Sequence, residues 1–256
     1  MQKVLGRVRR AADDYKMIEE GDRIAVAVSG GKDSMLLLGA LAAMRRFYKN
    51  KYELYAITVD LGFFGEQTDY SQITGYCESI GVEHHIKRSQ IGEIIFDIRK
   101  GSNPCSLCAK MRRGALHDFA KELNCNKIAL GHHADDAAET FIMNLFIEAR
   151  VGCYSPVTYL SRKDITMIRP LSLMSESEVR SAVKRLGIPV VKNKCPADHE
   201  GQRQKVKSLL KGLEKDGYYD MRDKIVGAMR RGDISGWKPF EIVRKTKSSE
   251  TNDETD

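Results

Sequence analysis

The chain has 256 residues, of which 42% are hydrophobic, so it can form one sizeable core with a small appended element. Lys and Arg outnumber Asp and Glu by 42 to 35, and the formal charge of +7 permits a polyanionic partner without requiring one. The longest apolar run, 35–44, is about half the length that crosses a membrane. Since the N-terminus also lacks the apolar stretch of a secretion signal, we expect a cytoplasmic protein with no membrane association.

The first part of the chain alternates between helical and strand patterns. Apolar residues from Val4 to Ile18 recur at helical spacing, and Gly21 is expected to end this opening helix. The β-rich run 23–28 predicts a buried strand, and the apolar segment 35–47 predicts a helix packed on the sheet. Further strands are expected at 52–59, 82–87 and 127–130, and further helices at 68–80, 107–123 and 135–146. This alternation predicts an α/β fold whose parallel sheet is covered on both faces and binds ligands at the C-terminal ends of its strands.

Beyond residue 150 the pattern is weaker. Residues 165–168 predict an edge strand, and 175–186 predict a helix that Ser175 and Glu178 begin as a capping box. Two more helices are expected at 202–213 and 218–229, and the tail 245–256 lacks apolar residues and is expected to be disordered. The domains we expect are an N-terminal helix at 1–21, a catalytic domain at 22–200, a C-terminal helical region at 201–244 and the tail.

The hexapeptide Ser29–Ser34 (SGGKDS) lies at a predicted strand–helix junction. Its two glycines allow a tight turn whose N–H groups approach an anion, and the next helix points its positive end at the same place. Lys32 adds a charge, and Ser29 and Ser34 add hydroxyl groups. Because Asp33 follows the lysine, this is not a Walker A loop. The alternative is an ordinary capped glycine turn, but the full hexapeptide at this junction favours a phosphate site.

Three of the six cysteines are candidates for metal binding. Cys105 and Cys108 open a predicted helix with the spacing that lets two thiolates reach one metal centre. Because no second Cys-x-x-Cys follows, a four-cysteine zinc ribbon is excluded, and the candidate third ligand is Cys195 in a polar loop. The remaining three are expected to be small buried hydrophobic residues: Cys77, Cys125 and Cys153.

The segment His132-His-Ala-Asp-Asp136 precedes a predicted helix. We expect one of the two aspartates, Asp135 or Asp136, to cap that helix and the other to face a nucleotide. Metal binding by the two histidines is disfavoured.

Several segments, in this order, resemble the tRNA 2-thiocytidine synthetases among the PP-loop ATP pyrophosphatases. The resemblance rests on 17–24 with Ser29–Ser34, on Cys105–Cys108 with Arg112-Arg113-Gly114, on 127–136, and on Gln202-Arg203-Gln204. More distantly, the chain resembles the 2-thiouridine synthetases that carry a three-cysteine cluster. The resemblance covers roughly residues 12–230. It implies a Rossmann-like core of the adenine nucleotide alpha-hydrolase type, with an N-terminal helix and C-terminal helices.

The resemblance also implies a role for each matched segment. The residues expected to bind the ATP phosphates are Ser29, Gly30, Gly31, Lys32, Asp33 and Ser34. The ligands expected for a [4Fe-4S] cluster are Cys105, Cys108 and Cys195. The residues expected to take part in catalysis, with Mg²⁺, are Lys32, Asp60, Asp135, Asp136 and Arg113. Arg112 and Arg113 are placed for anionic tRNA or an adenylate.

Two departures from the family bear on the substrate. Lys192 stands where many relatives have another cysteine, so Cys195 is the only local choice for the third ligand. The stretch 61–66 does not match the loop of the cytidine-specific enzymes, which leaves the exact base open.

The predicted helix 202–213 carries a basic face made by Arg203, Lys205, Lys207 and Lys211. Such a face either is solvated or contacts tRNA phosphates, and charge alone does not decide between the two.

The expected reaction is ATP-dependent thiolation of tRNA, in which a pyrimidine carbonyl oxygen, with cytidine C2 as the first candidate, is adenylated and replaced by sulfur. Three thiolates on a four-iron cluster would leave one iron open to hold sulfide. The expected partners are tRNA, a sulfur donor such as a cysteine desulfurase or free sulfide, and a second copy of the chain. One alternative is a cluster-free thiolase with a persulfide on Cys108 and Cys195. The other is a non-catalytic RNA-binding module, against which the intact loop residues argue.

Overall fold

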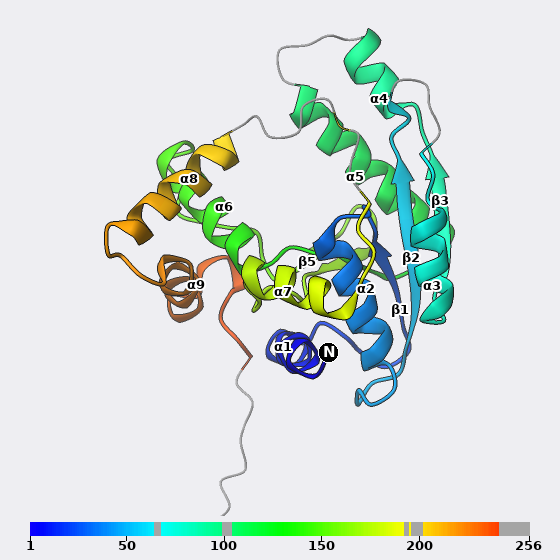
Figure 1. Cartoon of the computed structure of the whole chain (residues 1–256), viewed down its shortest axis with the longest axis horizontal. Helices are drawn as coiled ribbons and strands as arrows, with labels where there is room; N and C mark the ends of the chain where they lie inside the picture. The colour runs from blue at the N-terminus through cyan, green and yellow to red at the C-terminus, as the bar shows by residue number, and fades with distance from the viewer. Residues whose placement is uncertain (64–67, 99–103, 192–194, 196–201, 241–256) are drawn as a thin grey trace, which may run out of the picture.

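A computed structural model of the chain describes residues 1–63, 68–98, 104–191, 195 and 202–240. Its centre is a six-stranded sheet with the strand order β3-β2-β1-β4-β6-β5 (Figure 1). The strands are β1 (Asp22–Ala27), β2 (Tyr52–Asp60), β3 (Glu83–Arg88), β4 (Lys127–Ala129), β5 (Val157–Leu160) and β6 (Ile165–Ile168). The sheet is parallel except for β5, which pairs antiparallel with β6. The predicted parallel α/β fold is therefore confirmed.

Helices cover both faces of the sheet. They are α1 (Gln2–Asp14), α2 (Lys32–Met44), α3 (Ser71–Ser79), α4 (Ile91–Glu93), η2 (Ile94–Ile98), α5 (Pro104–Glu122), α6 (Ala134–Phe146), α7 (Glu176–Leu186), α8 (Gln202–Lys215), α9 (Met221–Arg231) and η3 (Ile234–Gly236). The larger core joins one face to α1, α2, α3 and α7, and α2 is apolar nearly all round because it is enclosed there. On the other face, α5 packs Leu116 and Ala120 against Ala25, Ile57 and Ile128 of the strands.

The parallel register brings the functional loops to one edge of the sheet. Ala27 at the end of β1 pairs with Ile57, and Asp60 at the end of β2 pairs with Arg88 of β3. Consequently the chain leaves β1, β2 and β4 at the same side, where parallel α/β sheets bind their ligands. The loop 28–31, residues 61–63 and residues 130–133 all lie at this edge.

The structure corrects two element predictions. The opening helix ends at Asp14, seven residues before Gly21, because Lys16 turns the chain with φ 47°. Ile18 is still buried, so its helical spacing reflects a packed turn. The strand at 165–168 was predicted as an edge strand but is internal. The edge position beside it is occupied by β5, which was not predicted.

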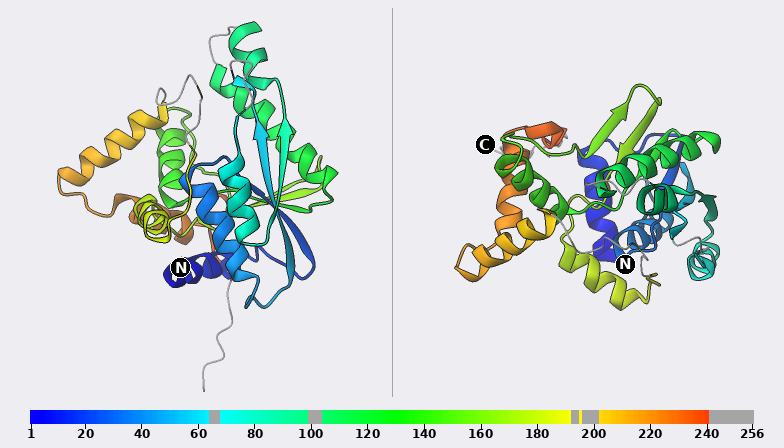
Figure 2. Two further views of the ribbon diagram at one scale, coloured as in Figure 1. Left: turned by 45° about the vertical axis from the view of Figure 1, so that its right-hand side comes forward. Right: turned by 90° about the horizontal axis from the view of Figure 1, so that it is seen from above.

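The C-terminal helices pack beside the sheet on α6 (Figure 2). Trp237 is fully buried, donates from Nε1 to the Tyr154 carbonyl at 2.7 Å and accepts a hydrogen bond from Tyr15 at 3.0 Å. Its contacts tie the end of the described chain to α1. The predicted division into domains stays a prediction, and the predicted disordered tail lies outside the described residues. Among the helices that are described, none is both long enough and apolar enough to cross a membrane.

Candidate active site

The hexapeptide forms a tight turn between β1 and α2. Gly30 has φ +80°, and a Cβ there would lie 3.1 Å from the Val191 Cβ and 3.2 Å from Ile73. The Gly30 carbonyl accepts a hydrogen bond from the Val191 backbone N–H at 3.0 Å. Inside the turn, the Ser34 hydroxyl donates to the Gly31 carbonyl at 2.9 Å. The loop therefore requires a glycine at position 30 and is held by a segment that comes much later in the chain.

Two other loops of the same edge pack against this turn. A Cβ at Gly131, just after β4, would lie 3.0 Å from the backbone of Asp33 and Ser34. The Ala134 N–H at the start of α6 donates to the Met174 carbonyl just before α7, at 2.8 Å. The N-termini of α2, α6 and α7 thus meet at one place. Helix N-termini carry partial positive charge and free N–H groups, so this place favours an anion.

Lys32 is the cation of the turn, and it is held by two carboxylates. Its Nζ lies 3.1 Å from Asp33 Oδ2 and 3.4 Å from Glu176 Oε1. The other oxygen of Asp33 is buried, lies 3.7 Å from His133 Nε2 and makes no hydrogen bond within the described part of the chain. That Lys32 and Asp33 bind the phosphates of ATP stays a prediction.

The acidic pair lies at the start of α6. Asp136 accepts from the His133 N–H at 2.9 Å and His133 Nδ1 accepts from the Asp136 N–H at 3.4 Å, which forms a capping box. The N-cap residue of α6 is thus His133, which was not predicted, and the expected contribution of an aspartate is made by Asp136 from the third helical position. Asp135 instead binds the start of α7, where it accepts from the Glu176 N–H at 2.7 Å and lies 3.4 Å from Arg222. That Asp135 acts on a nucleotide stays a prediction.

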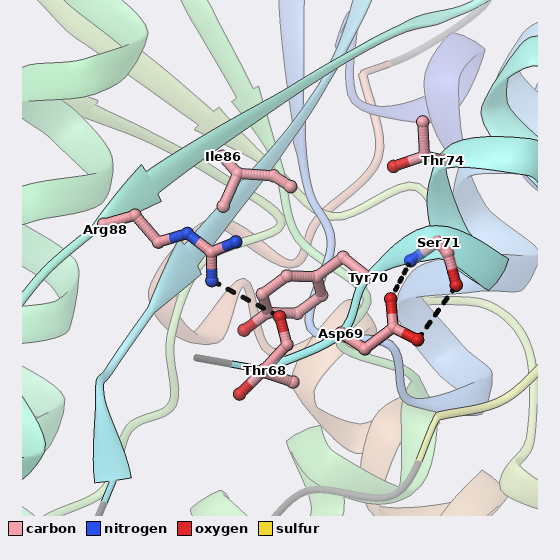
Figure 3. A pocket seen from close by; sticks show the side chains of 7 residues that line it. All are labelled: Thr68, Asp69, Tyr70, Ser71, Thr74, Ile86 and Arg88. Carbon is pink, nitrogen blue, oxygen red and sulfur yellow. Dashed lines mark hydrogen bonds between the residues drawn. The ribbon is translucent and has the colours of Figure 1, made fainter. Parts of the chain in front are cut away.

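Asp60 ends β2 and is buried, with 3% of its surface exposed. It forms an ion pair with Arg88 and accepts hydrogen bonds from the Gly62 N–H at 3.2 Å and the Thr68 hydroxyl at 3.4 Å. Arg88 also lies over the Tyr70 ring and lines a cavity of about 380 Å³ (Figure 3). The cavity is lined by Thr68, Asp69, Tyr70, Ser71, Thr74, Ile86 and Arg88. Asp60 is thus fixed at the same edge as the turn.

The structure brings the three candidate cysteine ligands into one region. Cys105 is exposed in the first turn of α5, whereas Cys108 lies in an apolar cluster with Leu61 and Phe63, the residues that follow β2. Cys195 packs against this cluster. Burial raises the pKa of Cys108, the Arg112 guanidinium lowers it in part, and the Cys195 and Cys105 thiols raise it again. Cys108 and Cys195 thus share one apolar cluster, and Cys105 lies in the same helix turn as Cys108.

No three His, Cys, Asp or Glu side chains of the described residues are arranged as ligands of a single metal ion. Cys77 and Cys125 are buried, as expected, while Cys153 is half-buried and donates to the Ala137 carbonyl at 3.4 Å. Arg113 is exposed on α5, one turn beyond Cys108. The roles assigned to these residues by resemblance stay predictions.

The sequence did not reveal several charged residues at this edge, chief among them Glu176. Its carboxylate lies 2.7 Å from Lys207 of α8, and Arg203 of α8 lies 3.2 Å from the buried Glu139 of α6. The basic face of α8 is therefore partly paired with acids of the protein, and its exposed lysines are Lys205 and Lys211. The capping box that begins at Ser175 located the start of α7, but it did not show that Glu176 faces Lys32.

Comparison with known proteins agrees with this geometry. A family described as "PP-loop domain" matches residues 4–212. The tRNA-cytidine(32) 2-sulfurtransferase of Geobacter sulfurreducens is 41% identical over 218 residues, which cover 84% of either protein. That of Syntrophotalea carbinolica is 40% identical over 223 residues, covering 86% of this chain and 85% of the relative.

A solved structure is also similar, that of the U34-tRNA thiolase NcsA from Methanococcus maripaludis with its [4Fe-4S] cluster. The similarity has a TM-score of 0.73 at 27% identity and covers 90% of this chain and 77% of the thiolase. The fold and the family expected from the motifs are therefore confirmed. The chain belongs to the PP-loop domain family, within the branch whose curated members are named tRNA-cytidine(32) 2-sulfurtransferases.

Proposed function

We propose that this chain is an ATP-dependent tRNA sulfurtransferase that replaces the C2 oxygen of a tRNA cytidine with sulfur. One observation carries the proposal: the phosphate turn and the three thiols share one edge of the sheet. The turn follows β1, and Cys108 packs on the residues that follow β2. Val191, four residues before Cys195, is hydrogen-bonded to Gly30. The identity of 40–41% to the named relatives supports cytidine as the substrate base.

The turn supplies what cleavage of ATP between its α and β phosphates needs. The N–H groups of the turn and three helix N-termini would hold the polyphosphate, with Lys32 as the point charge. The cytidine oxygen attacks the α-phosphorus, a new P–O bond forms and pyrophosphate leaves. A sulfur nucleophile then adds to C2, and AMP leaves with the original oxygen. Asp60, Asp135 and Asp136 are the carboxylates available for Mg²⁺, which binds oxygen ligands and phosphates.

The thiol site has the donor chemistry that an iron–sulfur cluster requires. Cys108 is enclosed by apolar side chains that raise its pKa, so its thiolate needs a nearby positive charge such as that of a metal. Each thiolate of a four-iron cluster binds a different iron, so three thiols need not meet at one ion. Cys105, Cys108 and Cys195 would hold the cluster, which when bound supplies iron that can carry sulfur. Arg112 and Arg113 would flank it toward tRNA.

Mass spectrometry of tRNA nucleosides from a strain lacking the gene tests the proposal, because 2-thiocytidine should disappear. Unchanged thionucleosides would contradict it. In vitro, anaerobically purified protein should release pyrophosphate only when tRNA is present. It should release AMP only when a sulfur donor is present as well, which we propose is a cysteine desulfurase or free sulfide. Lys32→Ala should lose this turnover and keep its iron absorbance.

The same preparation separates the alternatives. Full activity without iron would establish the persulfide route through Cys108 and Cys195. Absence of any tRNA-dependent ATP cleavage would instead leave an RNA-binding module.

A further inference from the structure

Glu176 is the point where the phosphate turn meets the C-terminal helices. Its Oε1 lies 3.4 Å from Lys32 Nζ, and its Oε2 lies 2.7 Å from Lys207 Nζ. One carboxylate therefore joins the lysine of the turn to a lysine of α8, the helix that packs on α6 (Figure 1). A third cation, Arg180, lies 3.1 Å from Oε1, but its side chain is 71% exposed.

Lys207 is as buried as the lysine of the turn. Its side chain is 28% exposed, the same as that of Lys32, whereas Lys211 one turn further along α8 is exposed. Burial lowers the pKa of Lys207, but the hydrogen bond and charge of Glu176 outweigh this and leave it raised. Burial likewise raises the pKa of Glu176, and Lys207 and Lys32 bring it down to about 2. Glu176 and Lys207 are therefore both charged near neutral pH.

The surroundings of this bridge favour an anion with more charge than one carboxylate. The N-termini of α2 and α7 both point here, since Lys32 and Glu176 are the first residues of those helices. Glu176 gives negative charge to both lysines, while Asp33 also lies 3.1 Å from Lys32 Nζ and the charge of Glu139 also acts on Lys207. A phosphate group presents several oxygens to the same cations and accepts from free N–H groups as well, so it is the stronger ligand for such a place.

We propose that Lys207 is a second cationic ligand of the nucleotide polyphosphate, and that Glu176 holds it and Lys32 until phosphate takes its place. The inference rests on ATP being the substrate, as proposed above, and it assigns a nucleotide contact to the C-terminal helical region. There are two alternatives: the Lys32–Glu176–Lys207 bridge only stabilises the fold, or Lys207 binds the phosphates of tRNA. Each would give a different result in the binding measurements that follow.

The test measures binding by calorimetry with the full chain, without tRNA and at fixed Mg²⁺. The probes are α,β-methylene-ATP, whose α–β linkage is not cleaved, pyrophosphate and AMP. The variants are Lys207→Met, the conservative Lys207→Arg, Glu176→Gln and, as the matched control on the same helix, Lys211→Met. A melting curve for each variant shows that it is folded.

Lys207→Met should weaken binding of methylene-ATP and pyrophosphate by at least about tenfold, since a charge-assisted hydrogen bond is lost. AMP, which lacks the β and γ phosphates, should bind as before. Lys207→Arg should recover most of the affinity, and Lys211→Met should not change it. Glu176→Gln should bind pyrophosphate more tightly than the parent, because the competing carboxylate charge is gone.

Unchanged pyrophosphate binding by Lys207→Met, or an equal loss for AMP, would overturn the proposal in favour of a structural bridge. If a separate filter-binding assay showed that this variant loses tRNA while it keeps pyrophosphate, Lys207 would instead serve the tRNA phosphates. Weaker pyrophosphate binding by Glu176→Gln would refute the exchange of Glu176 for phosphate. Because the calorimetric titrations need no tRNA, cluster or turnover, their failure is distinct from failure of the thiolation test.

Discussion

Replacing Gly131 with alanine should damage the phosphate turn from outside it. The new Cβ would lie 3.0 Å from the Asp33 carbonyl carbon and the Ser34 nitrogen, and 3.3 Å from the Asp33 Cβ. Two of these three atoms are backbone, so no flexible side chain can move aside. The start of α2 would have to shift by a few tenths of an ångström, and its N–H groups would move with it.

The magnitude follows from two opposing effects. Overpacking of this kind costs about 1–3 kcal/mol, and the reduced freedom of the unfolded chain returns about 0.4–1 kcal/mol. The expected net loss is up to about 2.6 kcal/mol, with a fall in melting temperature of about 2–4 °C per kcal/mol for a protein of this size. Pyrophosphate binding should weaken in parallel, because the shifted residues line the turn.

Gly114→Ala is the matched control. Gly114 lies inside α5, and a Cβ there would meet nothing within 4 Å. Alanine is favoured over glycine in a helix interior by about 0.5–1 kcal/mol, so this variant should be more stable than the parent and bind pyrophosphate normally. Differential scanning fluorimetry and calorimetric titration check both variants. If Gly131→Ala kept the melting temperature and pyrophosphate affinity of the parent, the close packing of the two loops would be refuted.

Two further predictions concern buried charge and buried histidine. Lys127→Met should lower the free energy of unfolding, measured in urea, by about 3–5 kcal/mol. The reason is that the buried Asp22, which lies 2.8 Å from Lys127 Nζ, loses its cation. A loss below about 1 kcal/mol would contradict this. His84 lies between the hydroxyls of Thr58 and Thr74, and burial lowers its pKa from 6.5 to about 4, with His85 adding to the effect. The unfolded chain therefore takes up the proton first, so the stability due to His84 is complete above about pH 6.5 and is lost as the pH falls toward 4. An NMR titration should place its midpoint near pH 4, and a midpoint near 6.5 would disprove the burial.

Much of the fold was predictable because the buried strands are continuous in sequence and apolar. The runs at 23–28 and 52–59 predict strands of a covered sheet, and β1 and β2 lie there. β5 was not predicted because it is an edge strand without fully buried residues, and its Tyr159 is 61% exposed. The early end of α1 was not predicted because it is caused by one backbone angle at Lys16, and a lysine does not indicate such a turn in the sequence.

The site was predictable only where it is local in sequence. The six residues of the turn are contiguous, and Cys105 and Cys108 share one helix turn, so their spacing made them candidates. Glu176 and Lys207 are 31 positions apart and belong to two different helices. On a single helix, Lys207 looks like any solvated lysine, and only the tertiary structure, which brings α8 to the start of α7, gives it a partner.

Five acids of this edge, among the residues that the structure describes, have cationic or N–H partners, and this explains how so many charges can lie together. The pairs are Asp33 with Lys32, Asp60 with Arg88, Asp135 with Arg222, Asp136 with the His133 N–H, and Glu176 with Lys207. An unpaired buried charge would be strongly destabilising, so the buried Asp60 requires Arg88, whereas the other four acids are partly exposed and depend less on their partners.

Magnesium and ATP together bring both signs of charge. In the proposed function, phosphate would pair with the lysines and the metal with carboxylates, so each charged group would exchange one partner for another. The ion pairs of this edge are thus compatible with the proposed binding of a metal–polyphosphate complex. Of these acids only Glu176 was missed in the sequence, because its partners Lys32 and Lys207 lie on two other helices.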